Sequence, residues 1–122
     1  MAGRVLLIED EPNIVEAIRF ILSRDGWQVD VHSDGATATE AVAHRAPDLV
    51  ILDVMLPNRS GYDILADLRA DASTETLPVL MLTARGQSKD REMAERFGAS
   101  RFMTKPFSNA EVLSSVRELA GQ

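Results

Sequence analysis

Cysteine is absent from this sequence, and several classes of protein are excluded with it. A chain without cysteine has no disulfide framework, no thiolate metal site and no cysteine nucleophile. Long apolar runs are also missing, since no stretch approaches the roughly 20 residues that a membrane-spanning helix needs. The apolar run at residues 5–8 is too short for a signal peptide. We therefore expect a cytoplasmic protein without membrane contact.

An excess of positive charge is missing as well. The chain has 13 basic and 19 acidic residues, and its formal net charge is −6. Proteins that bind nucleic acid usually carry a basic stripe, because neutralising phosphates supplies much of their affinity. Here the basic residues are scattered, so we expect no direct contact with DNA or RNA by this chain. With 45% hydrophobic residues among 122, the sequence predicts a single globular domain over residues 1–122.

Short apolar runs alternate with amphipathic segments along the chain. The expected strands are residues 5–8, 27–32, 49–52, 79–82 and 101–104, and a helix is expected after each of them. The run 49–52 is continuously apolar, which is typical of a strand covered on both faces. This alternation predicts a doubly wound α/β fold, with a five-stranded parallel sheet in the order 2-1-3-4-5 and five helices.

Polar side chains stand directly after the expected strands. Glu9 and Asp10 follow the first strand, Asp53 the third, Thr83 the fourth and Lys105 the fifth. In this strand order, ligands bind outside the carboxyl ends of the strands, where the fold reverses direction. Carboxylates beside apolar strands carry a desolvation cost that a divalent cation would offset. A ligand set made only of oxygen atoms favours Mg²⁺ or Ca²⁺ over Zn²⁺.

The same residues predict phosphoryl chemistry. A carboxylate such as that of Asp53 can accept a phosphoryl group covalently and form an acyl phosphate. Phosphoryl transfer mainly requires that the three equatorial oxygens are positioned and neutralised. A metal ion could hold one oxygen, the Lys105 ammonium a second, and the Thr83 hydroxyl with backbone amides the third.

Four motifs together resemble a known family. They are VLLIEDEP (residues 5–12), LVILDVMLPNRSG (49–61), VLMLTA (79–84) and FGASRFMTKPF (97–107). In this order and at these separations, the motifs are similar to those of a CheY-like receiver domain of two-component response regulators. The resemblance covers essentially the whole chain.

The resemblance implies a role for each residue of the expected metal site. Asp53 would be the phosphoacceptor, and Asp10 would bind Mg²⁺ directly together with it. The backbone carbonyl of Met55 would be a further ligand, and Glu9 would support the ion through water.

It also implies a switch. Thr83 would turn toward the phosphate, Lys105 would pair with it, and the Lys105–Pro106 bond would be cis. Phe102 would be the switch aromatic that turns inward when Thr83 moves. The side chains of Met55 and Arg85 would flank the site and affect the lifetime of the acyl phosphate.

The implied partners are proteins. A sensor histidine kinase or a histidine phosphotransfer protein would donate the phosphoryl group, and a downstream target protein would receive the signal. The chain would be a signalling domain, which at most assists its own phosphorylation and dephosphorylation. We expect a monomer or a weak phosphorylation-dependent dimer. Family members that dimerise through the last two helices often carry charges that are altered here, at Ser100, Arg101 and Ser115.

Other readings of these residues remain open at this point. Taken singly, Asp10 could cap the first helix, and Thr83 could be a solvent-facing loop residue. A phosphatase of the haloacid dehalogenase type is disfavoured, because it needs an acid where this chain has Met55. A flavodoxin is disfavoured by the acids after the first strand. A receiver cut from a DNA-binding transcriptional regulator is the main alternative to a free-standing receiver, which we expect.

Overall fold

Strands and helices alternate along the chain. The computed structural model describes residues 3–83 and 88–121. The expected alternation is confirmed, with one additional short 3-10 helix, η1, before the second α-helix. The elements are β1 (Arg4–Ile8), α1 (Pro12–Arg24), β2 (Gln28–His32), η1 (Gly35–Thr37), α2 (Ala38–Arg45), β3 (Leu49–Asp53), α3 (Gly61–Ala70), β4 (Val79–Thr83), α4 (Ser88–Phe97), β5 (Arg101–Thr104) and α5 (Asn109–Leu119).

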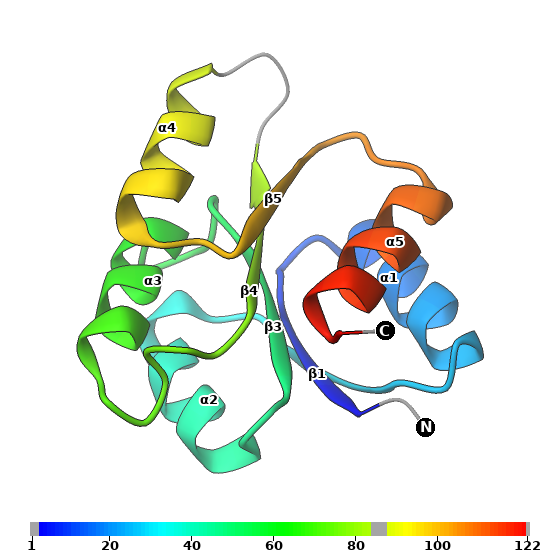
Figure 1. Ribbon diagram of the computed structural model, residues 1–122, viewed down its shortest axis with the longest axis horizontal. Coiled ribbons are helices and arrows are strands. Elements are labelled where there is room, and N and C mark those ends of the chain that lie inside the picture. The colour runs from blue at the N-terminus through cyan, green and yellow to red at the C-terminus, as the bar shows by residue number, and fades with distance from the viewer. Residues whose placement is uncertain (1–2, 84–87, 122) are drawn as a thin grey trace.

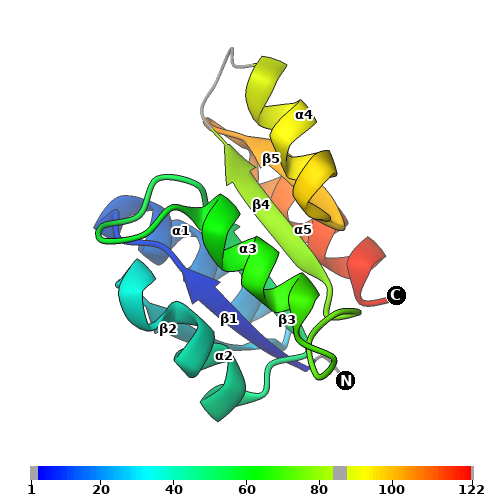
Figure 2. The same cartoon turned by 90° about the vertical axis from the view of Figure 1, so that its left-hand side faces the viewer.

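The strands form one parallel sheet in the order β2-β1-β3-β4-β5, as the sequence predicted. The register places Ile8 of β1 beside Leu52 of β3, and Asp53 beside Leu82 of β4. Because all the strands run the same way, their carboxyl ends meet at one edge of the sheet, toward which the arrowheads of β1 and β4 point (Figure 2). The residues that follow these ends are therefore brought together.

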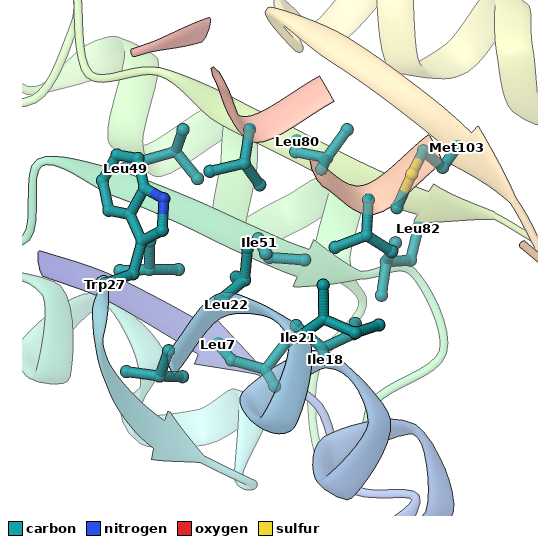
Figure 3. Close-up of a cluster of buried hydrophobic side chains, with 14 residues drawn as sticks. Leu7, Ile18, Ile21, Leu22, Trp27, Leu49, Ile51, Leu80, Leu82 and Met103 are labelled. Carbon is teal, nitrogen blue, oxygen red and sulfur yellow. The ribbon is translucent and has the colours of Figure 1, made fainter. Parts of the chain in front are cut away.

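Helices cover both faces of the sheet. Helices α1 and α5 lie on one side, and α2, α3 and α4 lie on the other (Figure 1). The strands alternate between the two sides, so that Leu7 and Ile51 face α1 and α5 while Leu6 and Val50 face the other helices. Figure 3 shows the buried cluster on the side of α1 and α5, with Trp27 at one end of it. Full burial of each large aliphatic side chain contributes roughly 1.5–3 kcal/mol.

The helix ends follow local sequence signals. Helix α5 begins with a capping box, in which Ser108 and Glu111 bond to each other's backbone amides. Gly98 follows α4 with a φ of +93°, the left-handed conformation that commonly ends a helix at a glycine. Helix α2 begins at Ala38, directly after the 3-10 turn η1, which the Asp34 side chain caps. Among the described residues, no helix has the length and apolar character needed to cross a membrane.

Candidate functional site

Asp53 is the last residue of β3 and lies at the carboxyl edge of the sheet. Its side chain is almost completely buried, and its residue exposure is 1%. Asp53 Oδ1 accepts a hydrogen bond from the backbone amide of Met55 at 3.2 Å. A Cβ atom at position 61 would lie 2.2 Å from the Asp53 carbonyl oxygen, so glycine is required where α3 begins behind the carboxylate. The Met55 amide therefore holds the carboxylate, and Gly61 lets α3 begin directly against the Asp53 backbone.

Lys105 joins the acids of the site. Its Nζ lies 3.0 Å from Asp53 Oδ2, 3.2 Å from Glu9 Oε1 and 3.6 Å from Glu11 Oε1. Partial burial works against the charged ammonium, but the hydrogen bond and the charge of Asp53, followed by those of Glu9, outweigh it and raise the pKa of Lys105. The Lys105–Pro106 peptide bond is cis, as the resemblance implied. Lys105 is therefore a permanent cation within reach of the proposed phosphoacceptor.

Glu9, at the same carboxyl edge of the sheet, is fully buried. Its Oε2 accepts backbone hydrogen bonds from Asp10 at 3.0 Å and Glu11 at 3.1 Å. Its Oε1 is buried and has no hydrogen-bond partner among the described residues, although the Lys105 ammonium is close. Burial, followed by the close approach of the Asp53 carboxylate, raises the pKa of Glu9 to about 7. The site thus holds more negative charge than its own groups neutralise.

Three carboxylates of the site lie close enough together to hold a metal ion. Glu9, Asp10 and Asp53 each bring an oxygen atom to within 4.8 Å of the others. Glu9 Oε1 accepts no hydrogen bond from the described residues, and the site has fewer positive than negative groups. Both observations fit an additional cation, and oxygen ligands suit Mg²⁺. The alternative role of Asp10 as a helix cap is wrong, because α1 begins at Pro12 with Glu11 in the cap position.

Thr83 ends β4 and is 2% exposed, so the reading of it as a solvent-facing loop residue is wrong. Its hydroxyl donates a hydrogen bond to the backbone carbonyl of Met103 in β5, at 3.3 Å. Phe102, the expected switch aromatic, precedes Met103 and is half-buried. Arg85, which was expected to flank the site, lies outside the described residues.

Glu11 also belongs to this site, although the sequence predicted no role for it. Its carboxylate is exposed, yet it lies 3.6 Å from the Lys105 ammonium. Its position directly after Glu9 and Asp10 could have indicated that it lies near the same strand end. The sequence did not show which of these three acids would face Lys105, because that depends on how the chain turns into α1.

The match to a protein family extends over nearly the entire domain. The family model of the response regulator receiver domain matches residues 5–117. The chain therefore belongs to the response regulator receiver domain family, whose members are phosphorylation-controlled signalling domains.

The relatives include transcriptional regulators. The chain is 41% identical over 115 residues to the probable transcriptional regulatory protein TcrX of Mycobacterium tuberculosis, covering 94% of this chain and 48% of that protein. It is 45% identical over 113 residues to the transcriptional regulatory protein KdpE of the same species, covering 93% of this chain and 49% of that protein. It is 38% identical over 117 residues to PhoB of Escherichia coli, covering 96% and 51%. The chain spans about half the length of these relatives.

Solved structures agree with the fold. A putative response regulator from Chloroflexus aurantiacus superposes with a TM-score of 0.95 at 29% identity, with 100% of both chains covered. The receiver domain of sensor histidine kinase PA1611 from Pseudomonas aeruginosa gives a TM-score of 0.90 at 28% identity, again over 100% of both chains. That structure has a magnesium ion coordinated in the active-site cleft.

Proposed function

We propose that Asp53 is the residue that accepts the phosphoryl group in this receiver domain. The observation that supports this proposal is the buried Asp53 carboxylate, held between the Lys105 ammonium and the acids that follow β1. An Asp53 oxygen attacks phosphorus, the bond from phosphorus to the histidine nitrogen of the donor breaks, and the electron pair leaves with the imidazole. The product is an acyl phosphate on Asp53.

Asp10 and Asp53 would hold Mg²⁺ directly, with the backbone carbonyl of Met55 as a further ligand and Glu9 supporting the ion through water. The acidic cluster and the buried Glu9 oxygen that accepts no hydrogen bond from the described part of the chain support this assignment. When bound, the ion supplies neutralisation of the phosphoryl oxygens. Lys105 supplies a second positive charge from the carboxyl end of β5, and so it orients the incoming group.

The added charge of roughly −1.5 to −2 then acts on two neighbouring side chains. Lys105 pairs with the phosphoryl oxygens, and the Thr83 hydroxyl leaves the Met103 carbonyl to donate to one of them. The space that Thr83 leaves allows Phe102 to turn inward, which changes the surface formed by β5 and α4. Phe102 has no hydroxyl, so its inward position depends on packing alone.

A groove beside the site supports the proposal that a protein donates the phosphoryl group. It has a volume of about 400 Å³, and Glu11 and Lys105 of the site take part in its lining with apolar residues such as Ile14 and Phe107. A second hollow on α1 shares Asn13 and Ala17 with this groove and is lined by Phe20, which is 62% exposed. We propose that the sensor kinase or phosphotransfer protein docks here, where its histidine can reach Asp53. Phe20→Ala should then slow transfer from that protein and leave labelling by acetyl phosphate unchanged.

A second candidate is a receiver that serves a transcriptional regulator. TcrX, KdpE and PhoB are transcriptional regulators, and this chain matches about half of each. In that case the altered surface would act on an attached DNA-binding domain instead of a separate target protein. The phosphoacceptor chemistry is the same for both candidates.

The experiment is incubation with acetyl phosphate and Mg²⁺ followed by intact-mass measurement. Wild type should gain one phosphoryl group, and Asp53→Asn should gain none. Labelling of Asp53→Asn to the same extent as wild type would show that another residue is the acceptor. Chelation of the metal before the reaction should abolish labelling of wild type.

A further inference from the structure

Phe102 connects β5 to the α4 side of the sheet. It is half-buried against the apolar cluster formed with α2, α3 and α4. Its neighbours in β5 face the opposite side, where Arg101 pairs with Glu118 of α5 and Met103 is buried against α1 and α5. Any movement of the ring therefore changes the contact between β5 and α4.

Arg91 of α4 covers this ring. Its guanidinium carbon lies 5.1 Å from the centre of the Phe102 ring, within the range of a cation–π contact. Arg91 also faces Glu95 one turn further along the helix, with Nε and Oε1 3.7 Å apart. Both side chains of that ion pair are 68% exposed, so the pair contributes little to stability. The contact with Phe102 links Arg91 to another element, β5.

The ring and the Thr83 hydroxyl belong to the same arrangement. Thr83 donates its hydrogen bond to the carbonyl of Met103, the residue after Phe102. A hydroxyl held in this way cannot also donate to a phosphoryl group on Asp53. The structure thus combines an engaged Thr83 with a Phe102 ring that lies under Arg91, as expected for the unphosphorylated domain.

We propose that Arg91 is a positioning residue that holds Phe102 in this resting arrangement, so that α4 sets how readily the domain switches. The inference rests on the proposed function, because Phe102 matters only if phosphorylation of Asp53 moves Thr83. A cation–π contact at an exposed site changes an equilibrium by about two- to fivefold. Removing Arg91 raises the population of the active arrangement by that factor, provided that this arrangement is the minor one.

Beryllofluoride, a stable phosphoryl analogue, tests this inference in the presence of Mg²⁺. Arg91→Ala should tighten its apparent affinity by about two- to fivefold and speed labelling by acetyl phosphate to a similar extent. Arg96→Ala is the matched control, since Arg96 is exposed on the same helix and its loss removes the same charge. Because losing a positive charge weakens attraction for an anion, tighter binding by Arg91→Ala has no simple electrostatic origin.

A double-mutant cycle isolates the contact itself. In a Phe102→Leu background, Arg91→Ala should have no effect on beryllofluoride affinity. Arg91→Lys should lie between wild type and Arg91→Ala, because it keeps the cation. In protein labelled with 4-fluorophenylalanine, Arg91→Ala should move the Phe102 fluorine resonance toward its beryllofluoride-bound position before any ligand is added.

The outcomes separate the two proposals. If wild type binds no beryllofluoride, or if Asp53→Asn binds it equally well, the proposed function fails. If wild type binds but Arg91→Ala binds equally or more weakly, the role of Arg91 is wrong. An equal gain for Arg96→Ala, or a gain that persists in the Phe102→Leu background, also contradicts it.

Discussion

The acids around Lys105 and the carboxylate that pairs with Arg117 form two clusters at opposite edges of the sheet. At the carboxyl edge, Glu9, Asp53 and the exposed Glu11 surround Lys105. At the amino edge, Asp25 follows α1 and accepts hydrogen bonds from two nitrogens of Arg117 in α5. The Trp27 indole donates a further hydrogen bond to Asp25, at 3.3 Å.

The difference between the clusters is one of charge balance. The Asp25 cluster has one carboxylate, one guanidinium and a donor for each carboxylate oxygen, so it needs nothing more. The hydrogen bond from Arg117 lowers the pKa of Asp25, whereas burial and Asp53 raise the pKa of Glu9 to about 7. A balanced cluster is part of the architecture that joins α1 to α5. An unbalanced one, kept buried, indicates a site that is completed by a ligand.

The largest difference should appear in metal affinity. Asp10→Asn removes an exposed carboxylate of the acidic cluster and should weaken Mg²⁺ binding at least about tenfold, because even groups behind the ligands change affinity by that much. Asp25→Asn removes the same charge at the other edge and should leave the affinity unchanged. Isothermal titration calorimetry measures both. Equal losses in the two variants would mean that net charge, and not the cluster, attracts the ion.

A second difference should appear in the pH dependence of stability without metal. The folded-state pKa of Glu9 is about 7, above the ordinary value of 4.5, so the native state binds more protons than the unfolded chain between these pH values. The free energy of unfolding therefore falls as the pH rises from 4.5 to 7, by on the order of 3 kcal/mol. Glu9→Gln should flatten this part of the profile and should be more stable than wild type at pH 8.

Urea denaturation in the presence of a chelator measures this profile. Added Mg²⁺ should stabilise wild type at pH 8 by binding the ionised cluster. Wild-type stability that stays level or rises between pH 5 and pH 8 without metal would contradict the raised pKa of Glu9.

The sequence predicted the fold because its period-2 and period-3.6 patterns were distinct and three of the strands contained unbroken apolar runs, at residues 5–8, 49–52 and 79–82. It also placed Asp53 and Lys105 at one edge, since that follows from strand order alone. It did not show that Thr83 would bond to the Met103 carbonyl, or that Arg91 would lie over Phe102. Those contacts depend on how neighbouring strands and helices pack, and residues far apart in the chain carry no local signal for them.

The Asp25 cluster could not have been found from the sequence for the same reason. Asp25 and Arg117 are separated by 92 positions, and each has the appearance of an ordinary charged residue at a helix end. Burial of Trp27 was easier to expect, because an indole next to a strand usually packs. The residues around Lys105 could therefore be predicted, because they follow strand ends. The Asp25 cluster could not, because its residues follow no such pattern.

The smallest effect is expected from Arg117→Gln, which unbalances the second cluster. At pH 7 the variant should show a slightly lower Tm, because an ion pair between partly exposed side chains contributes little. A carboxylate with a lowered pKa stabilises the fold above the unfolded value of about 3.8, and that contribution is lost as the pH falls through the folded value. The difference in Tm between wild type and variant should therefore shrink in acid, below the range in which Glu9 titrates. If Arg117→Gln instead altered Mg²⁺ affinity or the slope between pH 5 and pH 8, the two clusters would be coupled through α1.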